Sequence, residues 1–343
     1  MKNTIANKAK SKRQKAKTSF SGLRRMLPSI RFATQGAALR SSVFLLRSSF
    51  FGLLAFIFSF VLFSSCEDVI DVKLSDENLN LIGVEAEINT QDQPTVFLYK
   101  TLKVDQDVAY PGISGATVVL SDNASPANQI TLAENSSKPG YYTVPAGKQY
   151  PGVAGREYTL TIQTGGITLQ AKDKLAKVEA IDSIQVVPSQ RGEKRFLGVF
   201  TYGKEPKGLG NYYKWDIYLN GTLIHDADRL AVASDEFVDG NYISKLEIFT
   251  DFYDTNKPED RKIKLNDVVQ VKQTSISEFG YNYYFQLTNQ SQTGGLFSVP
   301  PANIKSNFTS SDGKPVLGLF VARDVSVSNK VTVTQKIEDQ LKK

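Results

Sequence analysis

The sequence has one histidine and one cysteine, and this scarcity limits the chemistry open to the chain. A single histidine excludes zinc sites built on two histidines, and any serine–histidine–aspartate arrangement would have to use His225. His225 lies beside Asp226 and Asp228, and no Gly-x-Ser-x-Gly elbow occurs, so we interpret it as a surface residue. Glycine motifs that bind phosphates or dinucleotides are also missing. The sequence therefore predicts no catalytic residues and no cofactor.

Acidic residues are absent from the first 65 positions, which hold twelve of the 41 Lys and Arg residues. Residues 66–343 carry the other 29 basic groups and all 35 acidic groups, a net charge of −6, although the whole chain is formally at +6. Binding to nucleic acid depends on clustered positive charge, and no Lys/Arg run with interleaved aromatic residues occurs. We therefore expect no nucleic-acid partner.

Long apolar runs are equally scarce, apart from residues 50–63 (FFGLLAFIFSFVLF). In a helix this run spans about 21 Å, which is short of the ~30 Å hydrocarbon core of a membrane. A basic stretch precedes it, and Ser64, Ser65 and Cys66 follow, so residues 1–65 are typical of a cleaved signal peptide, with Met26 as a possible start. An uncleaved membrane helix extended back through residues 43–46 would bury Arg47, which disfavours that alternative.

Cys66 stands where the signal peptide would be cut, and it has no second cysteine with which to pair. Attachment of diacylglyceryl and palmitate groups at this residue accounts for the lone thiol, so we predict lipidation of Cys66. Each buried CH₂ of the acyl chains adds ~0.8 kcal/mol to membrane binding. Residues 66–79 are polar and acidic, which predicts a tether between the lipid and the folded part.

Short β-rich runs separated by turn residues extend from position 80 to position 175, a pattern typical of an immunoglobulin-like β-sandwich. Tyr158, Leu160 and Ile162 alternate with threonines, so one face of that strand is expected to pack inward. Gly165-Gly166 suits a two-residue hairpin turn. The predicted strands are residues 81–88, 95–103, 116–121, 129–132, 140–144, 157–163 and 167–171.

A charged break at residues 172–177 precedes a second, larger β domain, which we place at 176–335. Its strongest signal is the Asn220-Gly221 turn between predicted strands 213–219 and 222–224. A Ser275-x-x-Glu278 capping box, followed by apolar residues at 279, 283 and 287, predicts a helix over residues 277–290. Further strands are expected at 178–187, 245–250, 268–274, 316–322 and 326–334, with a frayed tail at 336–343. The predicted fold class is all-β.

Aromatic residues are plentiful, with 15 Tyr and 20 Phe. Exposed tyrosine rings bind sugars or partner proteins, which makes Tyr212, Tyr213, Tyr253 and Tyr281 candidate ligand contacts. Core or edge-strand packing is the alternative role for these rings. Two acidic loops could supply oxygen ligands for calcium, but neither has EF-hand spacing, so we predict solvated loop tips and no metal site. These loops contain Asp235, Glu236, Asp239 and Asn241, and Asp251, Asp254, Asn256, Glu259 and Asp260.

The most distinctive residues of the second half are Tyr281 to Phe285 (YNYYF), Gly294 to Phe297 (GGLF), Pro300 to Ile304 (PPANI), Asn307, and Leu317 to Phe320 (LGLF). Together with Gly140-Tyr141-Tyr142 and Gly155-x-x-Tyr158-x-Leu160, they resemble a family of Bacteroidota outer-membrane lipoproteins, domain-of-unknown-function family 4249, over about residues 66–322. The resemblance implies a place at the outer membrane and, because members are often encoded beside TonB-dependent receptors, a role at such a transporter. The same residues also fit a structural role where helix, loop and last strands meet.

Glu67 and Asp68, directly after Cys66, resemble the signal that sends lipoproteins to the cell surface in such bacteria, although ordinary tether acidity is equally consistent. We therefore expect a non-enzymatic, lipid-anchored outer-membrane protein that faces the cell surface or the periplasm. Its expected partners are a TonB-dependent receptor and a glycan or small ligand. A surface adhesin or glycan-binding structural lipoprotein is the alternative. A carboxylate-dependent hydrolase is weaker, since its acid pair would be recognisable only in three dimensions.

Overall fold

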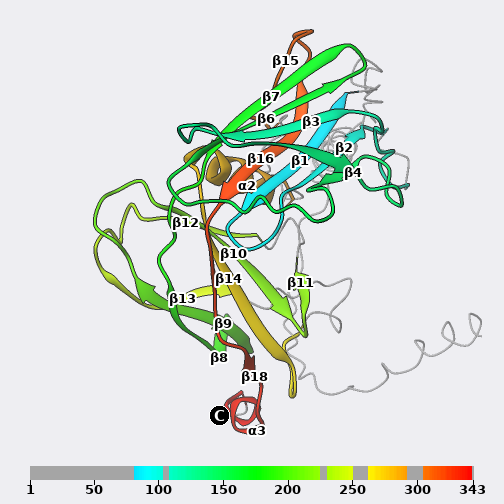
Figure 1. Cartoon of the computed structure of the whole chain (residues 1–343). Coiled ribbons are helices and arrows are strands. Elements are labelled where there is room, and N and C mark those ends of the chain that lie inside the picture. The colour runs from blue at the N-terminus through cyan, green and yellow to red at the C-terminus, as the bar shows by residue number, and fades with distance from the viewer. Residues whose placement is uncertain (1–80, 103–107, 225–229, 250–261, 292–303, 342–343) are drawn as a thin grey trace, which may run out of the picture. The chain divides into compact units, whose positions relative to one another are not determined.

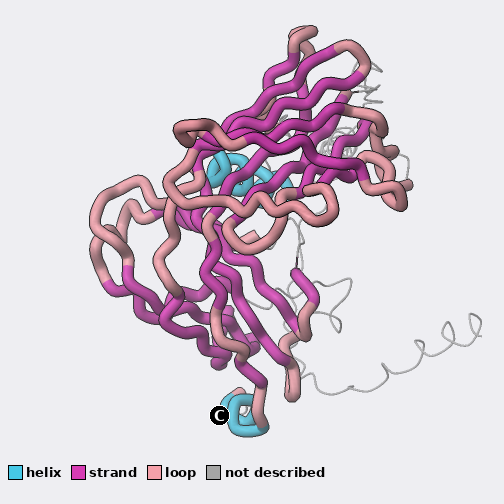
Figure 2. The backbone as a smooth tube through the Cα atoms, viewed as in Figure 1, coloured by secondary structure: helices cyan, strands magenta, loops and turns pink. Residues whose placement is uncertain are grey.

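The computed structural model of the chain describes residues 81–102, 108–224, 230–249, 262–291 and 304–341 (Figure 1). The predicted signal peptide, Cys66 and the tether lie outside the described residues, as do His225 and the acidic loop at 251–260. Strands dominate the described part, which confirms the all-β class (Figure 2). The immunoglobulin-like character of the N-terminal region stays a prediction. No helix in the described segments combines the length and apolar character needed to cross a membrane.

The first sheet has nine strands, and its order is β15-β7-β6-β3-β4-β5-β2-β1-β16. Every neighbouring pair is antiparallel except β1 and β16, which run parallel from Ile82↔Val316 to Asn89↔Arg323. The strands are β1 (Ile82–Asn89), β2 (Thr95–Lys100), β3 (Thr117–Asp122), β4 (Gln129–Glu134), β5 (Tyr141–Thr143), β6 (Glu157–Thr164), β7 (Ile167–Lys174), β15 (Thr309–Ser310) and β16 (Val316–Arg323).

β15 and β16 follow one another in the chain, yet they occupy opposite ends of this strand order. The sheet must therefore curl until its ends approach each other, and side chains join them there. Asp173 of β7 accepts the N–H of Ala322 at 2.8 Å. Asn307 accepts the N–H of Phe320 at 3.0 Å and donates to its carbonyl at 2.7 Å. The curled sheet encloses a core that takes residues from both its early and its late strands, among them Val84, Leu98, Tyr158, Phe308 and Phe320.

The remaining strands form two sheets around a second core. One has the order β11-β10-β14-β17, with β12 beside β10 and β18 beside β14, and the other has the order β13-β9-β8. Val199, Trp215, Val269 and Val271 are buried in this core. The strands are β8 (Ile181–Arg191), β9 (Lys194–Lys204), β10 (Tyr212–Leu219), β11 (Thr222–Ile224), β12 (Ala231–Ser234), β13 (Tyr242–Phe249), β14 (Val268–Ile276), β17 (Val325–Val327) and β18 (Val331–Thr332).

The predicted helix is present as α2 (Glu278–Ser291), and it packs where the nine-stranded and six-stranded sheets meet (Figure 1). Its tyrosines Tyr281, Tyr283 and Tyr284 cover a small cluster of Ile276, Leu319 and Val321. The predicted cap was wrong by two residues. Ser277, not Ser275, accepts the N–H of Gly280 at 3.1 Å, because Ser275 bonds instead to the carbonyl of Ala176 and the N–H of Asp324. Phe279, expected on the packed face, is exposed.

Three other expectations differ from the structure. The strand expected at 316–322 exists, but it completes the N-terminal sheet, since β1 offers it a partner that no local pattern reveals. The tail is not frayed throughout, because α3 (Gln335–Gln340) places Ile337 and Leu341 against the second core. β9 and β12 were not predicted, since Gly198 and Gly203 interrupt the first and small residues make up most of the second.

Both predicted glycine turns are correct, with positive φ at 165, 166, 220 and 221.

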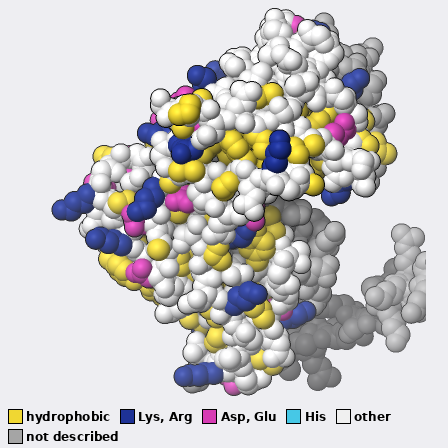
Figure 3. Space-filling view, in the orientation of Figure 1, with side chains coloured by type: hydrophobic (Ala, Val, Ile, Leu, Met, Phe, Trp, Pro, Cys, Tyr) yellow, Lys and Arg dark blue, Asp and Glu magenta, His cyan; other side chains and the backbone are white. Residues whose placement is uncertain are grey.

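Basic and acidic side chains are mixed on the face seen in Figure 3, where lysines and arginines stand singly or beside acidic groups. Elsewhere among the described residues the ion pairs include Arg156 with Asp122 at 2.6 Å and Lys272 with Asp92 at 3.3 Å. This face therefore presents no single-sign patch of the kind that a phosphate backbone would favour.

Candidate functional site

The structure brings two of the four candidate tyrosines together and separates the third from them. Tyr212 and Tyr281 have ring centroids 5.3 Å apart, and Phe285 stacks on Tyr281 at 5.9 Å. Tyr212 and Tyr281 line a cleft of about 310 Å³ with Leu209, Glu236 and Glu278. Tyr213 points to the opposite face of β10, as successive strand residues do. Tyr253 lies outside the described residues.

The acidic loop at 235–241 uses its carboxylates to hold the backbone of the neighbouring loop at 208–211. Asp235 accepts the N–H groups of Gly210 and Asn211, each at 3.1 Å, and Asp239 accepts that of Gly208 at 2.6 Å. The prediction of solvated carboxylates is wrong for Asp235, which is buried because it binds these N–H groups, whereas Asp239 is exposed. Among the residues that the structure places, no group of three or more His, Cys, Asp or Glu side chains could hold a metal ion.

A groove of about 540 Å³ lies between β1, β2 and α2, and we call it the α2 groove. Glu85 and Glu87 reach it because residues two apart on a strand share a face, while Val84 and Ile88 point into the first core. The other lining residues are Ala86, Thr95, Phe97, Tyr141, Lys214, Leu230, Tyr283, Tyr284, Leu287, Leu319 and Val321. The volume lies in the range of small-ligand sites, which are commonly concave and partly apolar.

A row of aromatic rings forms one wall of the α2 groove and continues beyond it. Phe97 stacks on Tyr141 with centroids 4.2 Å apart and on Tyr99 at 4.9 Å, and Tyr110 packs against Tyr99 at 4.8 Å. Lys138 covers Tyr141 from another side, with its amine 5.2 Å from the ring centroid. Because the rings cover one another's faces, the row offers its edges more than its faces to a ligand.

Buried charges join three strands beside this groove, and we call them the Arg323 network. Arg323 of β16 donates to Asp216 of β10 at 2.8 Å and to Glu87 of β1, while Lys214 pairs with Asp216. Lys214 also lies over the ring of Tyr284, 5.3 Å from its centroid. Burial alone would raise the pKa of Asp216, but the positive charges of Lys214 and Arg323 outweigh it and hold that pKa below the usual value.

Sequence reasoning missed the Arg323 network because its members are far apart in the chain. Arg323 is separated from Glu87 by 236 positions and from Asp216 by 107. One signal was present, since Lys214 and Asp216 alternate with the apolar residues of β10, and neither face of this strand meets water there. A buried strand that carries two charges on one face predicts a charged partner, although the partner's identity requires the fold.

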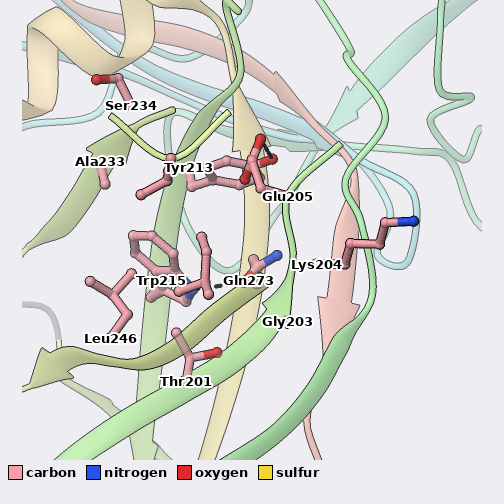
Figure 4. Close-up of a pocket in the computed structure, with 12 residues that line it drawn as sticks. Thr201, Gly203, Lys204, Glu205, Tyr213, Trp215, Ala233, Ser234, Leu246 and Gln273 are labelled. Carbon is pink, nitrogen blue, oxygen red and sulfur yellow. Dashed lines mark hydrogen bonds between the residues drawn. The ribbon is translucent and has the colours of Figure 1, made fainter. Parts of the chain in front are cut away.

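A second cavity, of about 110 Å³, lies inside the second β region between β9, β10, β12 and β13, and we call it the Trp215 cavity (Figure 4). Tyr213 and Trp215 form one wall, with centroids 6.0 Å apart. Trp215 donates its ring N–H to Gln273 at 2.9 Å, which fixes the ring. Tyr213 donates its hydroxyl to Glu205 at 2.9 Å. Val238, Ile243, Leu246 and Ala233 complete an apolar lining beside the hydroxyls of Thr201 and Ser234.

Burial and nearby negative charge disturb the titration of both polar groups at the end of the Trp215 cavity. Burial raises the pKa of Glu205, and the neighbouring Asp235 and Asp239 add to this effect although Tyr213 donates to the carboxylate. The pKa of Tyr213 is raised chiefly by burial and also by its bond to Glu205. Tyr213 therefore stays a hydrogen-bond donor, and Glu205 carries its negative charge at an energetic cost.

Two motif tyrosines of the N-terminal half, Tyr142 and Tyr158, are structural. Tyr142 donates to the carbonyl of Ile113 at 2.8 Å, and Tyr158 accepts the N–H of Val153 at 2.8 Å, with both rings buried in the first core.

No curated protein matches the chain. A family described as a domain of unknown function (DUF4249) matches residues 67–329, which include every strand of the nine-stranded sheet and the residues of both cavities. The chain belongs to this family of domains of unknown function.

Proposed function

We propose that this chain is a lipid-anchored outer-membrane protein of Bacteroidota type that binds a ligand for a TonB-dependent transporter and catalyses no reaction. The α2 groove carries the binding part of the proposal, because it combines ligand-sized volume with aromatic, aliphatic and charged walls. The apolar run before Cys66 and the acidic tether after it support the anchor and a position at the cell surface.

The carboxylates of the α2 groove favour binding over hydrolysis. Glu85 and Glu87 stand on the same strand and the same wall. Glycosidases instead place two carboxyl groups on opposite sides of the bond that they cleave. Glu87 is also held by Arg323 and by the side-chain amide of Asn89, at 2.6 Å. A carboxylate committed to a buried ion pair is poorly suited to exchange protons with a substrate.

The stacked rings support one of the two binding hypotheses over the other. A glycan adhesin would need aromatic faces open to sugar rings. Phe97 and Tyr141 cover each other, with 15° between their planes, and Lys138 covers Tyr141 further. We therefore favour a small ligand held against ring edges and charged groups. Strong binding of the purified protein to a glycan array would reverse this preference.

The anchor is tested by labelling cells with an alkyne-bearing palmitate. Full-length protein should take up the label and sediment with outer membranes, whereas Cys66→Ala should remain unlabelled and lose the membrane fraction. Equal labelling of the two proteins would refute lipidation at this position. Protease treatment of intact cells then separates the surface from the periplasmic face.

The ligand and partner are tested on full-length protein purified in mild detergent from its own outer membranes. Native mass spectrometry should detect a co-purifying small molecule, and affinity capture should recover a TonB-dependent receptor. Thr95→Trp places a large ring at the rim of the α2 groove and should remove the small molecule. Thr117→Trp, at an exposed position of β3 in the same sheet, is the matched control and should keep it. Retention of the ligand by Thr95→Trp would refute the groove as its site.

A further inference from the structure

The Trp215 cavity contains a buried carboxylate that has no cationic partner among the described residues. Glu205 is 2% exposed, and no described lysine, arginine or histidine forms an ion pair with it. Lys204 is the last residue of β9, and Figure 4 shows its amine pointing away from the cavity. The hydroxyl of Tyr213 and the side-chain amide of Asn211 donate hydrogen bonds to Glu205, but both donors are neutral and compensate only part of the charge. The cavity therefore has negative potential at one end.

The rest of the cavity suits a cation with an apolar surface. Tyr213 and Trp215 present ring surface to the space, and the negative faces of such rings attract ammonium groups. Val238, Ile243 and Leu246 supply aliphatic contacts, which favour alkyl groups on the nitrogen. The size suits a trimethylammonium head group, because a cavity of roughly 150 Å³ can hold benzene and about 110 Å³ holds this smaller group, while the remaining arm of the ligand lies toward the open side of the cavity.

We propose that the Trp215 cavity binds a small organic ammonium ion, with Glu205 as its counter-ion and the rings of Tyr213 and Trp215 as its walls. The hydroxyl of Thr201 or Ser234 can donate a hydrogen bond to a polar arm of the ligand or accept one from it. The Trp215 cavity is separate from the α2 groove, so this proposal does not depend on whether the groove binds a ligand.

Other ligand classes fit the cavity less well. An anion would meet Glu205 together with the negative charges of Asp235 and Asp239 nearby. A bare divalent metal ion requires about six oxygen ligands, and no suitable group of acidic residues exists in the described chain. A neutral apolar molecule would fill the space but would leave the buried carboxylate without compensation, which costs free energy.

Trp215 makes the test direct, because it is the only tryptophan of the chain and it lines the cavity. Full-length protein in detergent is titrated with choline chloride while tryptophan fluorescence is recorded, with sodium chloride added to keep ionic strength constant. The comparison ligand is the carbon analogue of choline, in which carbon replaces the charged nitrogen. Choline should give a saturable change, and the analogue should bind about tenfold or more weakly, since it lacks the charge.

Two variants test separately the charge of Glu205 and the volume of the Trp215 cavity. Glu205→Gln still offers an oxygen to Tyr213, and it should weaken choline about tenfold or more while leaving the carbon analogue unchanged. Glu193→Gln changes the same charge at an exposed hairpin and should not alter binding. Ala233→Met fills the cavity and should abolish binding of both ligands, with its thermal unfolding showing that the fold is kept. Equal affinity for choline and its analogue, unchanged choline binding in Glu205→Gln, or no saturable response to choline would overturn the proposal.

Discussion

Gly318 occupies a position in β16 at which a side chain would collide with the carbonyl oxygen of Val84 on β1. Its φ of +93° is also one that residues with a Cβ rarely adopt. We expect Gly318→Ala to lower the free energy of unfolding by at least about 2 kcal/mol, because the strain and the clash act together. Gly313→Ala is the control, since it has a similar φ of +72° but open space around its Cβ. Equal losses for the two variants in urea unfolding would show that the contact with Val84 does not matter.

Asp173 gives the fold a pH dependence of defined sign. Burial raises its pKa to about 6, even though Ala322 donates an N–H to the carboxylate. In the unfolded chain this group ionises near pH 4. Its protonation therefore contributes stability to the folded state that is fully present below about pH 4 and is lost as the pH rises through about 6. The loss is at most about 3 kcal/mol for a shift of this size. Asp173→Asn should flatten the stability curve between pH 4 and pH 7, as followed by chemical unfolding, and a curve parallel to that of the unmodified protein would contradict this.

At the scale of elements, the Arg323 network joins β16, β10 and β1 through charges that are largely withdrawn from water. The side chains of Arg323 and Asp216 are 13% and 8% exposed. Arg323→Met leaves the carboxylates of Asp216 and Glu87 with only Lys214 nearby, and we expect a loss of about 3 to 5 kcal/mol in unfolding free energy. Lys172→Met removes an exposed pair with Glu157, at 3.9 Å, and should cost no more than about 1 kcal/mol. Similar losses for both would mean that the network adds little.

The start of α2 depends on Ser277, whose hydroxyl accepts the N–H of Gly280. Ser277→Ala should destabilise the protein by about 1 to 2 kcal/mol, because one N–H of the first turn loses its partner and the buried carboxylate of Asp173 loses a hydrogen bond from the same hydroxyl. Thr334 precedes α3 without making such a bond, so Thr334→Ala should leave the stability nearly unchanged. Thermal unfolding of both variants, measured side by side, checks the difference. A larger effect at Thr334 would argue against this assignment of the cap.

Elements with a clear pattern in their own sequence were predictable. Alternation of apolar and polar residues gave β6 nearly to its ends, and Asn220-Gly221 gave the turn between β10 and β11. Elements that depend on distant partners were not. Nothing near Val316 indicates that its strand pairs with Ile82. Ser275 resembles a cap in sequence, but its hydroxyl is taken by groups from Ala176 and Asp324.

The candidate site divides in the same way. Tyr213 was a candidate from sequence, because aromatic residues on a strand are candidates for exposed contacts, and its ring lies in the wall of the Trp215 cavity. Glu205 was missed, since a single glutamate at the end of an unpredicted strand carries no pattern. Only the fold brings it to the hydroxyl of Tyr213 and to Trp215. The local pattern thus drew attention to one residue of the cavity wall but not to the charge beside it.

At the scale of the whole molecule, the first core cannot be completed by the N-terminal half alone. Phe308, Val316, Phe320 and Ala322 are part of it, and β16 covers the edge of β1. A fragment of residues 74–175 should therefore fail to unfold cooperatively and should aggregate, whereas residues 74–343 should give a single sharp transition. Circular dichroism and a proton–nitrogen spectrum of each fragment check this. A well-dispersed spectrum from the shorter one would show that it folds alone.

The parallel pairing of β1 with β16 has a consequence for biosynthesis. A ribosome releases β1 about 230 residues before its neighbour, as the separation of 234 positions between Thr90 and Asp324 illustrates. Until then β1 lacks one strand partner, and contacts of such long sequence separation slow folding. The sheet of a nascent chain stays unfinished until β16 emerges, so a translation product truncated before β16 should expose an unpaired strand edge that chaperones and proteases can recognise.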